Sequence, residues 1–278
     1  MNNTSRVARM TKSIIPLMSS CLARLHMHDL VRSAEIGMSL LQGKGAGSGW
    51  DMSGELRAAA GCIKRPDPIL VDVGANYGKW AQGMLQVFPA TRRVLRFEPQ
   101  EDCLVKLAGL PFPGKTVIAS AVSDHSGVDP FYVSGAGWGA ASLYERNETP
   151  FLARPQRKIT VPVTTLDAAL ESEGIEFVDF AKFDIEGAEL AAFRRATRSF
   201  SRGGIGALSL EFGSGNINSK TFFRDFWDLL TGYGFEIHRV LPGGSILRID
   251  EYFEDLEYFR GVSNYLCKAT RNDSSRRS

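Results

Sequence analysis

The chain has 278 residues, enough for one large domain or for a core domain with an appendage. With 44% hydrophobic residues it can bury a full core, and its net charge of +2 gives no global electrostatic case for binding nucleic acid or a membrane surface. None of its four cysteines falls in a C-x-x-C pair, which favours a reducing, cytoplasmic location over a disulfide framework or a structural zinc site.

Residues 1–65 are predicted to form an N-terminal helical extension without strands. LVRSAEIGMSLL has helical spacing, GKGAGSGW is a flexible break, and SGELRAAAGC predicts another short helix. A basic start followed by SIIPLMSSCLA is only faintly similar to a signal peptide, because Pro16 and two serines interrupt the apolar run and no clear cleavage site follows. We interpret that segment as a basic amphipathic helix. No run approaches the roughly 20 apolar residues of a membrane span.

From Ile69 onward, strand-like apolar runs alternate with helical segments, which predicts a parallel sheet with helices on both faces. Residues 66–270 are therefore expected to form one α/β domain, followed by a disordered tail at 271–278. Strands are predicted at 69–73, 93–97, 116–122, 178–184, 206–212, 235–241 and 263–269, and helices at 78–88, 100–109, 187–199 and 219–231. Residues 128–166 interrupt this alternation, and we interpret them as an insertion near a ligand, with a plain surface hairpin as the alternative.

The stretch ILVDVGANYGKW ends a predicted buried strand in an aspartate and a glycine loop. In an open α/β sheet, ligands bind beyond the carboxyl ends of the strands, and Gly74 and Gly78 let the backbone approach such a ligand closely. A dinucleotide loop would read G-x-G-x-x-G, but here Asn76 stands near the place of the central glycine. The carboxylate of Asp72 would repel a phosphate and suits a cationic ligand.

A second carboxylate, Glu98 in RFEPQ, ends the next predicted strand. A carboxylate at this place can hydrogen-bond both ribose hydroxyls of an adenosine. The alternative is a charge at a helix N-terminus, with Pro99 at the first helical position. Together with the Asp72 loop, we favour the ribose role. The site then suits an adenosine with a positive group and no pyrophosphate, which describes S-adenosylmethionine.

A third signal is VDFAKFDIEGAEL, where a predicted buried strand holds Lys182 and Asp184 on one face. A buried lysine must be paired, and Asp184 or Glu211 of the next strand could pair it. A structural ion pair with an acidic helix start would explain Glu189. It explains Asp184 and Glu211 poorly, because both sit at strand ends where a ligand belongs.

Taken together, VDVGANYGKWA, RFEPQEDCLVKL, SAVSDHSG and TTLD…VDFAKFDIEGAEL resemble the FkbM-type family of S-adenosylmethionine-dependent methyltransferases, and SLYERN and LSLEF add to the resemblance. It covers residues 69–213. It implies a Class I, Rossmann-like α/β fold with a seven-stranded, mostly parallel sheet whose last strand, NYLCKA, is antiparallel. It also implies S-adenosylmethionine as cofactor and O-methylation of a sugar or another small natural-product or glycan hydroxyl.

The resemblance also assigns roles to residues. Asp184 would lie closest to the sulfonium and the acceptor, and Glu98 with Pro99 would hold the ribose. Ser123 and Asp124 would sit by the adenine. The methionine end would be lined by Asp72, Gly74, Ala75, Asn76, Tyr77 and Gly78.

Methyl transfer to an alcohol benefits from a base, and Asp184 and then Glu186 are our candidates. His125 and His238 are alternative bases. We predict no metal, although Asp184, Glu186 and Glu211 could instead hold a divalent ion that lowers the hydroxyl pKa.

For the acceptor we select four residues, three of them in the loop SGAGWGAASLYER. Trp138 could stack on a sugar face, Tyr144 or Arg146 could bond its hydroxyls, and Glu211 could bind it as well. The alternative is a tryptophan that covers the sheet edge. The N-terminal helices could close over the site or form a homodimer contact, and the sequence leaves both open.

Two other function classes stay open. A nicotinamide-dependent oxidoreductase on a Rossmann fold is disfavoured by the missing glycine and by Asp72, and a non-catalytic methyltransferase-like binding module is disfavoured by the intact site residues. A nucleic-acid methyltransferase is disfavoured because DIEG replaces the Asn/Asp-Pro-Pro-aromatic motif and no basic stripe appears.

Overall fold

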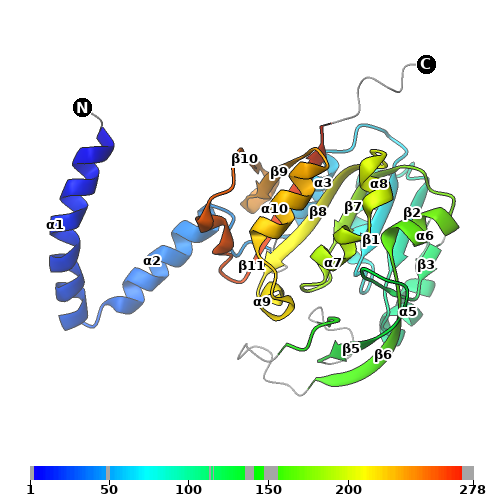
Figure 1. The fold of residues 1–278 in the computed structure, drawn as a ribbon, viewed down its shortest axis with the longest axis horizontal. Coiled ribbons are helices and arrows are strands. Elements are labelled where there is room, and N and C mark those ends of the chain that lie inside the picture. The colour runs from blue at the N-terminus through cyan, green and yellow to red at the C-terminus, as the bar shows by residue number, and fades with distance from the viewer. Residues whose placement is uncertain are drawn as a thin grey trace. The chain divides into compact units, whose positions relative to one another are not determined.

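The computed structural model describes residues 3–47, 51–112, 114, 116–134, 141–146 and 156–270. The chain divides into two compact units, Met1–Gln42 and Gly43–Ser278. The first unit holds helices α1 (Asn3–Arg24) and α2 (His28–Leu41), drawn in blue in Figure 1. The predicted tail at 271–278 lies outside the described residues.

The first unit is shorter than the extension expected over residues 1–65. Helix α3 (Met52–Ala60) belongs to the second unit, because Ala58 and Ala59 are buried in the same hydrophobic cluster as Leu70 of the first strand. The tertiary contacts of α3 therefore place the division after residue 42.

One eight-stranded sheet forms the centre of the second unit, in the order β10-β9-β11-β8-β7-β1-β2-β3. Neighbours from β8 to β3 pair in parallel, and β11 runs antiparallel to both β8 and β9. All seven predicted strand regions contribute a strand to this sheet. Its strands are β1 (Ile69–Val73), β2 (Arg93–Phe97), β3 (Thr116–Ile118), β7 (Val178–Phe183), β8 (Ile205–Gly213), β9 (Phe235–Val240), β10 (Ile246–Ile249) and β11 (Val262–Ala269).

The predicted seven strands are thus too few, because β10 adds an eighth at the edge by pairing antiparallel with β9. Two of its four residues are exposed, so it lacks the apolar run by which the sequence predicts a buried strand. The predicted strand at 116–122 also differs, since its second half, β4 (Ala121–Val122), leaves the main sheet. It joins β5 (Gly127–Val133) and β6 (Arg157–Thr164) in a three-stranded sheet of order β4-β6-β5, and β5 from residue 128 onward and β6 lie in the predicted insertion.

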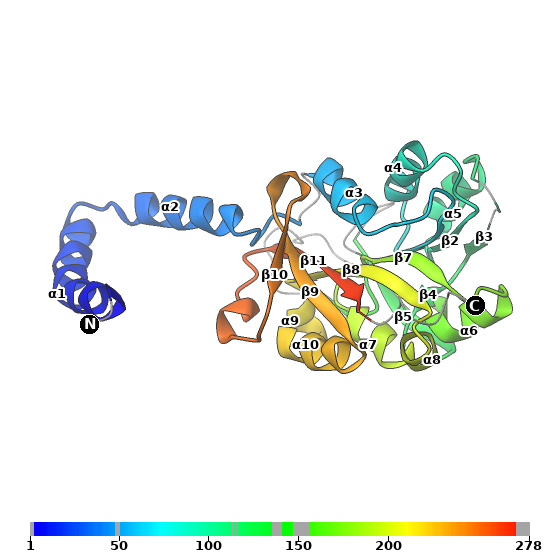
Figure 2. The same ribbon diagram turned by 90° about the horizontal axis from the view of Figure 1, so that it is seen from above.

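Helices cover both faces of the main sheet, with α3 and α4 on one face and α7, α8 and α10 on the other (Figure 2). The predicted helix at 187–199 is two short helices. The carboxylate of Asp167 accepts the backbone N–H groups of Arg198 and Ser199, and so anchors the first turn of the second helix separately. The remaining helices are α4 (Lys79–Val87), α5 (Glu101–Ala108), α6 (Leu166–Ser172), α7 (Glu189–Arg194), α8 (Thr197–Ser201), α9 (Gly215–Ser219), α10 (Phe223–Gly232), and the 3-10 helices η2 (Pro242–Gly244) and η3 (Glu254–Glu257).

Each face of the sheet has its own hydrophobic cluster. On the α10 face, the ring of Phe193 meets that of Phe183 edge to face at a centroid distance of 4.7 Å and also contacts Phe200 and Phe226. On the α3 face, Trp80 and Phe180 stack at 5.8 Å. Both faces of the sheet are thus packed against helices, and this packing fixes the positions of the carboxyl ends of its parallel strands relative to one another.

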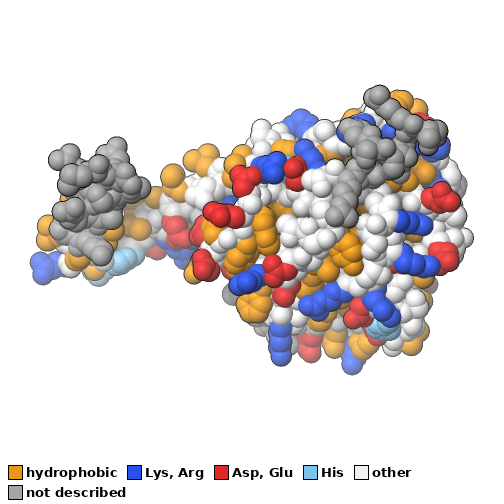
Figure 3. All heavy atoms as spheres, turned by 45° about the horizontal axis from the view of Figure 1, so that its top comes forward, with side chains coloured by type: hydrophobic (Ala, Val, Ile, Leu, Met, Phe, Trp, Pro, Cys, Tyr) orange, Lys and Arg blue, Asp and Glu red, His pale blue; other side chains and the backbone are white. Residues whose placement is uncertain are grey.

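The surface shows mixed charge. On the face drawn in Figure 3, basic and acidic side chains are interspersed, in keeping with a net charge of +2. Among the described residues, no helix has both the length and the apolar character needed to cross a membrane.

Phe193 tests the aromatic cluster. Phe193→Ala should lower the free energy of unfolding by about 3–5 kcal/mol, because it opens a cavity among three aromatic rings. Val105→Ala, at a side chain that is 71% exposed on α5, is the matched control and should change stability by less than about 0.5 kcal/mol. Urea denaturation measures both, and equal effects would contradict the packing described.

Candidate active site

The glycine loop after β1 is held between the ends of β2 and β7. The backbone N–H groups of Gly74 and Ala75 donate to the carbonyl of Phe97 at 3.0 and 2.9 Å. Gly74 has φ +80°, and a Cβ at this position would overlap the carbonyl oxygen of Asp184. Only glycine therefore fits both the backbone conformation and the space. Gly78, at φ +72°, begins α4 in the same left-handed region.

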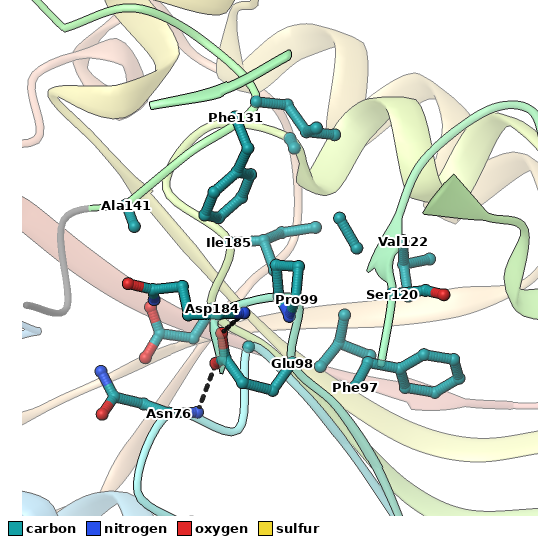
Figure 4. A pocket seen from close by; sticks show the side chains of 16 residues that line it. Asn76, Phe97, Glu98, Pro99, Ser120, Val122, Phe131, Ala141, Asp184 and Ile185 are labelled. Atoms are coloured by element: carbon teal, nitrogen blue, oxygen red, sulfur yellow. Dashed lines mark hydrogen bonds between the residues drawn. The ribbon is translucent and has the colours of Figure 1, made fainter. Parts of the chain in front are cut away.

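Glu98 fastens the loop from the neighbouring strand. Its Oε2 accepts the backbone N–H of Asn76 at 2.8 Å, and its Oε1 accepts that of Gln100 at 2.9 Å (Figure 4). The residue is 2% exposed, and burial raises the pKa of its carboxyl while the two backbone donors oppose the rise. Each carboxylate oxygen keeps a second lone pair, so Glu98 can still accept a ligand hydroxyl. Its predicted ribose role stays a prediction.

A cavity opens beside Glu98, at the carboxyl ends of β1, β2 and β7. Five predicted cofactor residues line it: Gly74, Asn76, Glu98, Pro99 and Asp184. The remaining walls are largely apolar, and the sequence analysis missed them because an apolar residue at a strand end has the same pattern as core. These walls include Val73, Phe97, Val122, Phe131, Leu143, Ile185 and Ala188.

The other predicted cofactor residues lie around this cavity without lining it. Asp124 is paired with His125 at 2.9 Å, and Ser123 is buried beside it. Asp72 points to the α3 face and is 1% exposed. Ala75, Tyr77 and Gly78 complete the loop that carries Asn76.

A row of buried charges crosses the sheet below the loop. Asp72 on β1 lies opposite Arg96 on β2 and opposite Lys182 on β7. Burial raises the pKa of Asp72 to about 6, while Lys182 opposes the rise. Arg96 opposes the rise as well. The guanidinium of Arg96 lies 3.9 Å from the ring centre of Phe112.

Lys182 is 8% exposed, and its Nζ donates to Asp184 Oδ2 at 2.7 Å. Burial alone would lower the pKa of Lys182, but the carboxylates of Asp184, Asp72 and Glu211 outweigh burial and raise it. The lysine is therefore charged, and the predicted pairing with Asp184 is confirmed.

Three carboxylates gather beyond Lys182, as the sequence predicts. Oxygens of Asp184, Glu186 and Glu211 all lie within 4.8 Å of one another. Buried and half-buried acids also gather without an ion, so we assign no metal to them. Burial raises the pKa of Glu186 to about 7 although Arg146 opposes the rise, and burial together with Asp184 and Glu186 raises that of Glu211 well above its usual range.

The backbone at Glu186 has φ +55°, a conformation that its surroundings enforce. Gly187 follows at φ +101° and packs against the backbone of Gly215, where a Cβ would lie 2.5 Å from the carbonyl oxygen. Glu189 closes the turn, because its two oxygens accept the N–H groups of Ile185 and Gly187 at 2.9 Å each. The turn that presents Glu186 is therefore rigid.

Of the predicted acceptor residues, Arg146 is 5% exposed and already engaged. Its guanidinium bonds the carboxylate of Glu186, and its Nη2 donates to Ser214 Oγ at 2.7 Å. The structure thus brings Arg146 to the predicted catalytic carboxylate. Tyr144 is half-buried. Trp138 lies outside the described residues.

Neither predicted alternative base belongs to the carboxylate cluster. The ring of His125 is half exposed and pairs with Asp124 and Asp129. His238 is 6% exposed in β9, and burial lowers its pKa.

A second cavity, of about 350 Å³, lies on the α3 face of the sheet. Its polar lining includes Lys182 and Glu211, joined by Glu55 of α3 and Asn264 of β11. Glu55 accepts a hydrogen bond from Asn264 Nδ2 at 2.7 Å, across 209 positions of sequence. The sequence analysis missed both residues, because neither lies in a motif.

Parts of the chain are similar in sequence to known proteins. The methyltransferase FkbM domain matches residues 72–237, more than half of the chain. The 2-O-methyltransferase NoeI of Sinorhizobium fredii (strain NBRC 101917 / NGR234) is 27% identical over 145 residues, which cover 48% of this chain and 59% of that protein. The chain thus spans less than two thirds of this curated relative.

Two solved structures show weaker likeness. The methyltransferase FkbM of Methylobacillus flagellatus KT is 19% identical and has a TM-score of 0.44, with 72% of this chain and 44% of that chain covered. The plantazolicin methyltransferase BpumL in complex with SAH is 9% identical and has a TM-score of 0.40, with 78% of this chain and 84% of that chain covered.

Gly74 provides a direct test of the loop. Gly74→Ala should lower the melting temperature by several degrees, because the added Cβ must displace the Asp184 carbonyl and alanine disfavours positive φ. Gly232→Ala, at the end of α10 with nothing within 4 Å of the added Cβ, is the control and should leave the melting temperature unchanged or raise it. Calorimetric unfolding measures the melting temperatures of both variants. An unchanged melting temperature in Gly74→Ala would show that the loop tolerates a side chain.

Proposed function

The chain belongs to the FkbM family of methyltransferases, whose methyl donor is S-adenosylmethionine, and we propose that it transfers the methyl group to a hydroxyl of a sugar or another small natural-product or glycan acceptor. Support for a hydroxyl acceptor comes from the likeness to NoeI, which is named as a 2-O-methyltransferase. The sugar class follows from the resemblance of the motifs. The family also removes the ground for a nicotinamide-dependent oxidoreductase.

The observation that carries the proposal is the excess of carboxylates around the cofactor cavity. The carboxylates of the site outnumber the cations that face them by one, with Asp72, Asp184, Glu186 and Glu211 against Lys182, Arg96 and Arg146. Buried charge of one sign is costly unless an opposite charge meets it, so a cationic ligand at this place stabilises the site. A sulfonium satisfies this requirement, and a pyrophosphate would not. The residues present therefore fit the cofactor of the family.

When bound, S-adenosylmethionine supplies an electrophilic methyl group on a cationic sulfur. We assign its ribose to Glu98, its methionine end to Gly74 and Asn76, and its apolar base to the walls near Val122. The acceptor oxygen must then approach to about 3 Å in line with the leaving sulfur.

Asp184 reaches the reacting centre from β7 and, held by Lys182, accepts a hydrogen bond from the acceptor hydroxyl. Glu186 is the second predicted catalytic carboxylate, and Arg146 restrains it. Since an oriented hydroxyl is a better nucleophile than a freely rotating one, both carboxylates raise the rate mainly by positioning.

A cytoplasmic location is part of the proposal and is supported by four free cysteines. The possible homodimer and the absence of nucleic-acid partners stay predictions. The remaining rival is a non-catalytic binding module, and cofactor binding with turnover distinguishes it from an enzyme.

Glu98 tests the cofactor pocket. Glu98→Ala should weaken binding of S-adenosylmethionine at least tenfold, because it removes both the loop anchor and the acceptor for the ribose hydroxyls. Glu101→Gln, on the exposed start of α5, should leave affinity unchanged. Isothermal titration calorimetry with S-adenosylmethionine and S-adenosylhomocysteine measures both variants, and unchanged affinity in Glu98→Ala would reject the assigned pocket.

Asp184 tests the chemistry. In an assay of S-adenosylhomocysteine release with a panel of methyl glycosides, Asp184→Asn should lower kcat by about 10²-fold or more and affect KM less. The physical reason is that the amide no longer aligns the hydroxyl or pairs Lys182. Full activity in Asp184→Asn would remove Asp184 from the reaction. No turnover by the native chain on any glycoside would reject the sugar class.

A further inference from the structure

We propose that Glu211 is the carboxylate that takes the proton of the acceptor hydroxyl, and that it ionises when the cationic methyl donor binds. The proposal rests on the proposed function and deepens it, since it assigns the proton transfer to a residue that the sequence suggested for pairing Lys182, binding the acceptor or holding a metal ion, but not as the base.

The first observation is how the three carboxylates differ in their partners. Asp184 accepts a hydrogen bond from Lys182 at 2.7 Å, and Glu186 pairs with Arg146. Within the described ranges, Glu211 makes no hydrogen bond and no contact ion pair, and its charge interacts with that of Lys182 at longer range. A base needs a free lone pair that faces its substrate, and Glu211 is the member of the cluster that offers one.

The second observation is where Glu211 lies. It stands near the end of β8, opposite Asn264 of β11, and lines the cavity on the α3 face. Asp184 lines the cofactor cavity, and oxygens of the two residues lie within 4.8 Å. The Asp184–Lys182 pair thus separates the two cavities. An acceptor hydroxyl at this boundary contacts Asp184 and Glu211 together.

The third observation is the charge around Glu211. From β7 it faces Asp184 and Lys182, from the following turn Glu186, and from α3 Glu55. Three carboxylates against one ammonium, with burial, hold the pKa of Glu211 well above its usual range. Glu211 therefore binds a proton more readily than an exposed carboxyl does. A sulfonium in the adjacent cavity favours the ionised form and releases that proton.

The proposed methyl transfer breaks two bonds and forms two. The acceptor O–H bond breaks, and its proton goes to Glu211 Oε. The acceptor oxygen forms a bond to the methyl carbon, with the electron pair of the broken carbon–sulfur bond left on the sulfur as a neutral thioether. Because the positive charge has gone, Glu211 keeps the proton until the next cationic donor binds.

Proton release on cofactor binding tests whether Glu211 ionises when the cationic methyl donor binds. Titration calorimetry of the native chain in buffers of different ionisation enthalpy counts the protons released. S-adenosylmethionine should release more protons than S-adenosylhomocysteine, which lacks the sulfonium charge. Because release strengthens binding as pH rises, the affinity ratio of the two ligands should increase between pH 6 and pH 8 in favour of S-adenosylmethionine. Equal release by the two ligands would overturn the proposal.

Variants identify the group. Glu211→Gln, a neutral group of the same shape, should abolish the difference in proton release while the melting temperature stays near that of the native chain. Asp72→Asn removes a nearby acid whose pKa is raised to about 6 and is the control that should keep the difference. Glu186→Gln and Glu55→Gln each remove a charge that raises the pKa of Glu211, so they should diminish the difference without abolishing it. A difference that survives in Glu211→Gln would overturn the proposal.

Turnover tests whether Glu211 takes the proton of the acceptor hydroxyl. With a methyl glycoside that the native chain accepts, Glu211→Gln should lower kcat by about 10²- to 10⁴-fold with little change in the affinity for S-adenosylmethionine. An unchanged kcat would show that another group takes the proton. If the native chain bound no S-adenosylmethionine, the proposed function itself would fail. Binding without a Glu211-dependent proton would reject only this inference.

Discussion

The burial of Lys182 in the central strand β7 is the constraint on which the site depends. An ammonium that is 8% exposed must be surrounded by carboxylates, and the sheet supplies them from three neighbouring strands as Asp72, Asp184 and Glu211. Arg96 faces Asp72 and Arg146 pairs with Glu186, so one carboxylate of the site has no cation of its own. We propose that this carboxylate favours a cationic cofactor over a phosphate at the carboxyl edge of the sheet.

The loop after β1 depends on the same edge. Gly74 has no room for a side chain because the Asp184 carbonyl occupies the space, and Glu98 secures the loop through two backbone N–H groups. The backbone that carries Asp184 thus also limits the position of the glycine loop. Arg146 adds a further restraint by tying Glu186 to Ser214.

The two faces of the sheet contribute differently. The cofactor cavity opens at the strand ends beside Glu98, whereas the second cavity lies on the α3 face, where Glu55 and Asn264 join Glu211. In the proposed reaction the Asp184–Lys182 pair lies between donor and acceptor. In this arrangement the sulfonium charge in the cofactor cavity can change the protonation of Glu211 on the α3 face, because the two groups interact through the poorly screening protein interior.

The sequence alone determined the alternation of strands and helices, the glycine loop, the place of Glu98 at a strand end, and the need of Lys182 for a carboxylate partner, because each follows from local pattern or from the burial of one strand. The structure selected Asp184 rather than Glu211 as the contact partner of Lys182. Tertiary structure decided the rest. The contacts of α3 moved the boundary from residue 65 to residue 42, and Asp167 divided the helix expected at 187–199. The Arg146–Glu186 pair and the Glu55–Asn264 contact join residues that are distant in sequence, so no local sequence pattern predicts either of them.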